Sequence, residues 1–118
     1  MSNNNLAPDG FNFIQESHGI NEYNLKSNGL RVLTLSDRSA PVATFMVTYH
    51  VGSRNEAIGY TGSTHLLEHL MFKGSRNFNK EKGTAIWDEL QSIGAQINAT
   101  TWNDRTNNFE VVPSEQLE

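Results

Sequence analysis

One short segment of this 118-residue sequence has the residue types and spacing that metal chemistry requires. Residues 65–69 read His-Leu-Leu-Glu-His. On a helix, side chains at i and i+4 have Cβ atoms about 5 to 6 Å apart, and from there two imidazole nitrogens can reach one Zn²⁺ at about 2.0 to 2.1 Å. Glu68 then lies beside the metal, where a carboxylate can act as general base on zinc-activated water. The spacing predicts peptide-bond hydrolysis, with His65 and His69 as zinc ligands.

The flanking residues predict a helix over residues 61–74. Thr61 suits the N-cap, Lys73 suits the carbonyl end of the helix dipole, and Gly74 suits a left-handed C′ position. At about 100° per residue, one side of this helix carries the chemistry and the other is apolar. The chemical side holds His65, Glu68, His69 and Phe72, and the apolar side holds Leu66, Leu67, Leu70 and Met71. The alternative is an ordinary amphipathic helix, since such a pattern also arises by chance.

The composition limits both the size of the protein and its metal chemistry. The length allows one domain with a modest core. There is no cysteine, so any metal must be held by histidine and carboxylate. The net charge is −4 and no basic run occurs, so we expect neither nucleic acid nor an anionic membrane as partner.

The same sequence gives little information on location. It shows no signal-peptide pattern and no apolar run long enough to span a membrane. We expect a soluble chain whose compartment is unknown: cytoplasmic, or periplasmic if a signal was removed.

Turn signals divide the rest of the chain into strands and a second helix. Asn28-Gly29 between extended segments is a strong hairpin signal, and residues 84–93 have helical periodicity that ends at Gly94. The predicted strands are residues 20–26, 30–35, 42–51, 95–102 and 105–112. Their order predicts an α+β fold, an antiparallel sheet with helices packed on one face.

The other metal-competent side chains have no ligand-like spacing. His18 lies in a turn and His50 at a strand end, and we assign neither a metal role. The late carboxylates Glu110, Glu115 and Glu118 lie on or after a strand, with no spacing that makes one a zinc ligand.

Four blocks of the sequence resemble the pitrilysin/insulinase family of zinc peptidases, whose signature is the inverted H-x-x-E-H. They follow the family's order and are similar to bacterial processing-protease-like members. The blocks are residues 28–32, 52–56, 65–74 and 94–101. The resemblance implies the incomplete half of a pitrilysin-type domain. Residues 20–118 are then the N-terminal part of a peptidase domain. The Asn-rich start of the chain has little apolar content, so we expect residues 1–19 to be a flexible tail or arm.

The resemblance also implies roles for individual residues. His65 and His69 match the zinc-ligating histidines, and Glu68 matches the general base. Asn98 and Ala99 match the strand edge to which the family adds its substrate as an extra strand.

Two departures from the family accompany these matches. The third zinc ligand, a glutamate on a later helix, is expected beyond Glu118. Asn108 stands where the family commonly has an aromatic residue, which we expect to loosen packing.

The implied function is that of a zinc-dependent metalloendopeptidase acting on extended peptides. We expect an N-terminal fragment that needs remaining domains or a homologous subunit to complete the chamber. With two histidines alone we expect weak metal binding, and with missing elements an exposed apolar surface. The alternative is a non-catalytic peptide-binding or subunit-docking module of the same fold.

Overall fold

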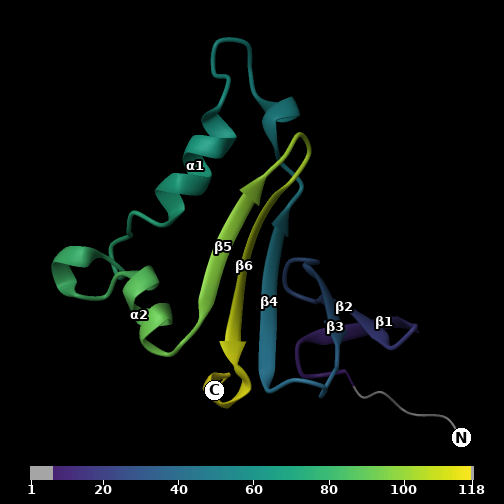
Figure 1. Cartoon of the computed structure of the whole chain (residues 1–118). Helices are drawn as coiled ribbons and strands as arrows, with labels where there is room; N and C mark the ends of the chain where they lie inside the picture. Colours follow the sequence, from purple (N-terminus) through teal and green to yellow (C-terminus); the bar gives the residue numbers. More distant parts are fainter. Residues whose placement is uncertain (1–6, 118) are drawn as a thin grey trace, which may run out of the picture. The chain divides into compact units, whose positions relative to one another are not determined.

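The computed structural model describes residues 7–117, which form two compact units. The first unit ends at Ala40 and the second begins at Pro41. The strands are β1 (Phe11–Ser17), β2 (Ile20–Leu25), β3 (Arg31–Leu35), β4 (Val42–Tyr49), β5 (Gln96–Thr101) and β6 (Thr106–Pro113). The helices are α1 (Ser63–Met71) and α2 (Ile86–Ser92), with short 3₁₀ turns η1 (Ser53–Asn55), η2 (Lys80–Lys82) and η3 (Ser114–Gln116) (Figure 1).

The first unit is an antiparallel sheet in the order β1-β2-β3. The predicted hairpin between β2 and β3 is confirmed. Gly29 takes a φ of +75°, and its N–H donates to the Leu25 carbonyl at 2.8 Å. Asn28 Oδ1 accepts from the Leu30 N–H at 3.0 Å. The Asn-Gly pair therefore closes the turn as its chemistry requires.

Residues 11–17, which we expected within a flexible arm, form strand β1 and pair with β2. Phe11 and Phe13 pack edge-on against Tyr23, with ring centroids 6.5 Å and 5.6 Å apart. These aromatic contacts give β1 an apolar partner. Residues 1–6 of the expected tail lie outside the described residues.

The second unit holds an antiparallel sheet in the order β4-β6-β5, which makes β5 an edge strand. The predicted hairpin of β5 and β6 is confirmed. Along β5 the side chains of Ile97, Ala99 and Thr101 are buried or half-buried, whereas the residues between them are exposed. Both helices contact β5 (Figure 1), and they cover this one face. The α+β fold is confirmed, with its strands divided between two sheets.

Both helices are shorter than predicted. α2 covers Ile86–Ser92, and Gly94 with a φ of +79° follows its end as expected. α1 ends at Met71 with Phe72 as its C-cap, so Gly74, which we expect at C′, lies one residue beyond the observed C′ position, with a φ of +127°. None of the helices within residues 7–117 has the length and apolar character needed to cross a membrane.

The apolar side of α1 is open to solvent. Its four large side chains are 45% to 58% exposed: Leu66, Leu67, Leu70 and Met71. On β4, Phe45 is 61% exposed and Met46 53%. The expected exposure of apolar surface is therefore confirmed.

Candidate active site

His65 and His69 come together on α1, and both of their side chains are exposed. Their Nε2 atoms are 3.1 Å apart and their ring centroids 4.7 Å apart. Two nitrogens bound tetrahedrally to one Zn²⁺ at about 2.0 to 2.1 Å stand about 3.3 Å apart. The two rings therefore already present their Nε2 atoms at nearly the separation that one zinc ion requires.

No third ligand joins these histidines among the described residues. Within residues 7–117, no three histidine, cysteine, aspartate or glutamate side chains gather as a metal-binding group. The donor set that the structure brings together is therefore a pair of imidazoles. Imidazole is a ligand type that suits zinc, but two ligands are fewer than the three that catalytic zinc sites commonly have.

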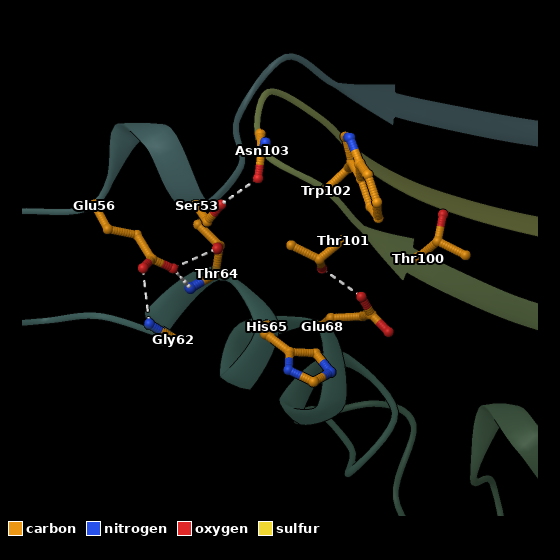
Figure 2. Close-up of a pocket in the computed structure, with 10 residues that line it drawn as sticks. All are labelled: Ser53, Glu56, Gly62, Thr64, His65, Glu68, Thr100, Thr101, Trp102 and Asn103. Carbon is orange, nitrogen blue, oxygen red and sulfur yellow. Dashed lines mark hydrogen bonds between the residues drawn. The ribbon is translucent and has the colours of Figure 1, made fainter.

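Glu68 lies between α1 and β5, on the same helix as the two histidines. It is only 8% exposed. The Thr101 hydroxyl on β5 donates a hydrogen bond to Glu68 Oε2 (Figure 2). Glu68 Oε1 has no hydrogen-bond partner among the described residues. The carboxylate is held by one oxygen and keeps the other available.

A pocket of about 460 Å³ lies between the start of α1 and the end of β5 (Figure 2). His65 and Glu68 line it from the helix, and Thr101 lines it from the strand. The remaining lining residues are Ser53, Glu56, Gly62, Thr64, Thr100, Trp102 and Asn103. The general-base candidate and one histidine therefore face a space open to a substrate.

The start of α1 differs from the prediction. The N-cap is Gly62 rather than Thr61, in a left-handed conformation with a φ of 91°, and it makes no side-chain cap bond. Glu56 accepts hydrogen bonds from the N–H groups of Gly62 and Thr64 and from the Thr64 hydroxyl. These hydrogen bonds, first those of Thr64 and then that of Gly62, lower the pKa of Glu56 below its ordinary value of 4.5. A carboxylate six residues earlier therefore caps the helix.

The backbone of Ala99 faces the open edge of β5. The Trp102 N–H donates to the Arg105 carbonyl at 2.8 Å, across the hairpin. Backbone groups alternate along an antiparallel strand, so those of Ala99 point away from β6. The Ala99 N–H accordingly donates to the side chain of Asn98, at Oδ1, over 2.8 Å. Both residues expected to contact substrate thus lie on a strand that is at the edge of its sheet within residues 7–117, and the backbone of Ala99 faces the open side.

Two residues important for this geometry were not assigned from the sequence. Thr101 was recognised only as part of a family block, and its contact with Glu68 joins positions 33 apart in the chain. Glu56 likewise belongs to a family block, residues 52–56, and the sequence gives it no role of its own. The sequence signal that could have identified it is a carboxylate a few residues before the predicted helix start, where a negative charge is favourable.

The chain belongs to the insulinase family of peptidases, since the family described as Insulinase (Peptidase family M16) matches residues 31–118. An uncharacterized zinc protease of Streptomyces coelicolor is 38% identical over 95 residues, which are 79% of this chain and 20% of that protein. Cytochrome b-c1 complex subunit 1 of Rattus norvegicus is 38% identical over 96 residues, 80% of this chain and 19% of that protein.

Solved structures agree with this assignment. The crystal structure of pitrilysin superposes with a TM-score of 0.76 and 27% identity, covering 90% of this chain and 12% of that one. The fold is therefore that of a pitrilysin-like domain. The chain spans about a fifth of the length of the two sequence relatives.

Proposed function

We propose that this chain carries the histidine pair and the general base of a zinc-dependent metalloendopeptidase. His65 and His69 are the metal ligands in this proposal, and Glu68 is the general base. The observation that carries it is the 3.1 Å separation of the two Nε2 atoms on the helix that also presents Glu68 to a pocket. Family membership and a relative named as a zinc protease support it.

The chain's own contribution to the chemistry is proton transfer by Glu68. Zinc, when bound, polarises the scissile carbonyl and lowers the pKa of the attacking water. Glu68 takes a proton from that water as its oxygen forms the new bond to the carbonyl carbon. The same carboxylate then gives the proton to the leaving amine as the C–N bond breaks. The Thr101 hydroxyl keeps Glu68 oriented during both transfers.

We propose that the substrate is an extended peptide that adds to the edge of β5. The backbone N–H and carbonyl of Ala99 supply main-chain hydrogen bonds, and Asn98 contacts the peptide with its side chain. The Asn98 amide oxygen accepts from the Ala99 N–H, so it must turn aside as the peptide carbonyl takes its place. Strand addition favours flexible peptides over folded proteins, because the substrate must be extended.

The third ligand and the remaining walls of the site are also proposals. Catalytic zinc sites commonly have three protein ligands. We propose that a glutamate outside residues 7–117 supplies the third, and that further domains or a homologous subunit close the chamber.

The test is peptide hydrolysis by the full-length product of this gene, loaded with Zn²⁺. Glu68→Gln should lower kcat by about 10²-fold or more, in the range of a lost general base. Glu89→Gln is the matched control, because Glu89 is an exposed carboxylate on α2. Hydrolysis that survives Glu68→Gln at the wild-type rate would remove Glu68 from the mechanism.

A second candidate function is a non-catalytic subunit-docking or peptide-binding module. Two observations favour it: the exposed apolar side of α1 and a relative named as a subunit of the cytochrome b-c1 complex. Under this function the full-length product with Zn²⁺ binds an extended peptide without cleaving it, and a chelator leaves the peptide Kd unchanged. Chelator-sensitive cleavage contradicts it.

A further inference from the structure

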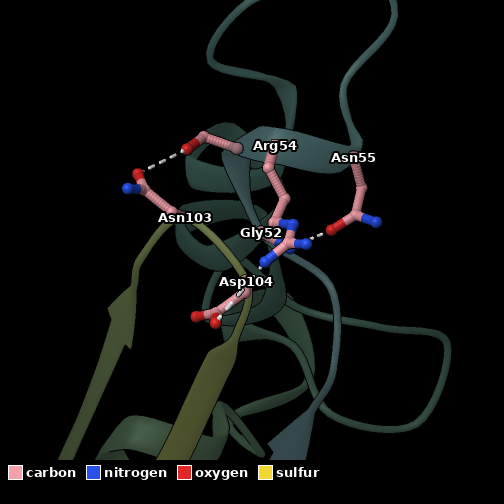
Figure 3. A network of polar contacts seen from close by, with 6 residues as sticks. Gly52, Arg54, Asn55, Asn103 and Asp104 are labelled. Carbon is pink, nitrogen blue, oxygen red and sulfur yellow. Dashed lines mark hydrogen bonds and ion pairs between the residues drawn. The ribbon is translucent and has the colours of Figure 1, made fainter.

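The loop after β4 is hydrogen-bonded to the turn between β5 and β6 (Figure 3). The Ser53 N–H donates to the Trp102 carbonyl at 3.0 Å, and the Arg54 N–H donates to the Asn103 carbonyl at 2.8 Å. Gly52 lies so close to this turn that a Cβ there would stand 2.1 Å from the Trp102 oxygen. One end of the loop is therefore fixed to the strand that carries Thr101.

The other end of the same loop is hydrogen-bonded to the first turn of α1 through Glu56. Its Oε2 accepts from the Gly62 N–H at 2.7 Å, and its Oε1 accepts from the Thr64 N–H at 2.9 Å and from the Thr64 hydroxyl at 2.5 Å (Figure 2). Both oxygens are used. His65, the first histidine of the candidate metal pair, follows Thr64 directly, so these hydrogen bonds end one residue from the candidate metal site.

We propose that Glu56 is a positioning residue of the peptidase site, which holds α1 at a fixed separation from β5. The inference rests on the proposed function. The loop of residues 52–56 joins the β5–β6 turn to the first turn of α1, and His65 and Glu68 follow on that helix. Without Glu56, the N-terminal turn of α1 loses three hydrogen bonds. The N-cap residue Gly62 has no side chain that could replace them.

Substitution of Glu56 by glutamine separates the effect of its hydrogen bonds from the effect of its side-chain volume. The introduced amide would keep one oxygen, but its NH₂ group would face an N–H donor at the other position. Glu56→Gln should therefore loosen the Gly62 or the Thr64 contact while keeping the side-chain volume. Glu22→Gln is a matched control in the other unit. Glu22 also uses both oxygens, accepting from Gln15 at 2.8 Å and pairing with Arg31 at 2.6 Å.

The experiment combines amide hydrogen exchange at Gly62 and Thr64 with calorimetric Zn²⁺ titration of the chain. Glu56→Gln should speed exchange at one or both amides and weaken Zn²⁺ binding by about tenfold, the lower end for loss of an orienting partner. Glu56→Ala should weaken it further, and Glu22→Gln should leave the Zn²⁺ affinity at the wild-type value. In the full-length product, Glu56→Gln should lower kcat more than it raises KM, because peptide binding depends on the β5 edge.

The inference is overturned if Glu56→Gln and Glu56→Ala both keep the wild-type Zn²⁺ affinity and the wild-type exchange rates. It is also overturned if Glu22→Gln weakens Zn²⁺ binding as much as Glu56→Gln does. If the full-length product binds Zn²⁺ but cleaves no peptide, the proposed function is wrong. In that case Zn²⁺ affinity and amide exchange that still respond to Glu56→Gln support the positioning role.

Discussion

Replacing Thr101 by valine should destabilise the second unit, because it strips Glu68 of its hydrogen-bond donor. Glu68 is 8% exposed, so water has little access to take the place of the Thr101 hydroxyl. Valine has nearly the shape of threonine, and the packing of β5 against α1 therefore stays in place. A hydrogen bond to a charged group contributes about 1.5 to 3 kcal/mol. We expect the free energy of unfolding to fall by this amount.

Urea unfolding followed by tryptophan fluorescence measures the change. Both tryptophans of the chain, Trp87 and Trp102, belong to the second unit, so the signal reports on the unit that holds the site. With an m value of about 1 to 3 kcal/mol/M, the midpoint should drop by roughly 1 M. Thr100→Val is the matched control, because Thr100 is exposed and should change stability by less than about 0.5 kcal/mol.

The result that would refute this reasoning is a Thr101→Val midpoint equal to that of Thr100→Val. The hydroxyl of Thr101 would then contribute nothing to holding the carboxylate. The orientation of Glu68 would have to come from packing alone.

Three further predictions concern the surroundings of the site. Gly52→Ala should lower the free energy of unfolding, measured by thermal unfolding, by about 3 kcal/mol or more, because its Cβ would stand 2.1 Å from the Trp102 carbonyl oxygen. Gly83→Ala is the control: a Cβ there meets nothing within 4 Å, and the loss should be about 1 kcal/mol. Equal losses in the two variants would contradict the tight contact at Gly52. The pKa of Glu56 in the folded chain lies below its ordinary value of 4.5. Above pH 4.5 the charged carboxylate therefore stabilises the fold, and this stabilisation is lost as the pH falls through the lowered pKa. The urea midpoint difference between wild type and Glu56→Gln should therefore be present at neutral pH and shrink as the pH falls below 4.5, and a constant difference would refute the assignment. Asn108→Val should raise the free energy of unfolding by about 1 kcal/mol, because Asn108 Nδ2 is buried without a hydrogen-bond partner among the described residues. The urea midpoint measures this change, and a lowered midpoint would show that the Asn108 amide does make a stabilising hydrogen bond.

Local chemistry accounts for the elements that were predicted correctly. The Asn28-Gly29 turn needs residues that tolerate positive φ, and Gly29 supplies it. The histidine pair follows from helix geometry, because side chains at i and i+4 meet on one side of any helix. The family blocks added the identity of the fold, which periodicity could not give.

Contacts between distant parts of the chain account for what was missed. Strand β1 is stabilised by the packing of Phe11 and Phe13 on Tyr23. No pattern within residues 11–17 indicates that Tyr23 is their partner. The division of the strands between two sheets also depends on pairing that local signals do not specify. Glu56 caps α1 because the loop folds back on the helix, which made Thr61 the wrong N-cap.

The most direct test of the central claim is a calorimetric titration of Zn²⁺ into the chain, its His65→Ala variant and a His50→Ala control. If His65 and His69 form the metal pair, wild type and His50→Ala should bind one Zn²⁺ with the same affinity, and His65→Ala should lose that binding. Zn²⁺ binding that is unchanged in His65→Ala would contradict the account.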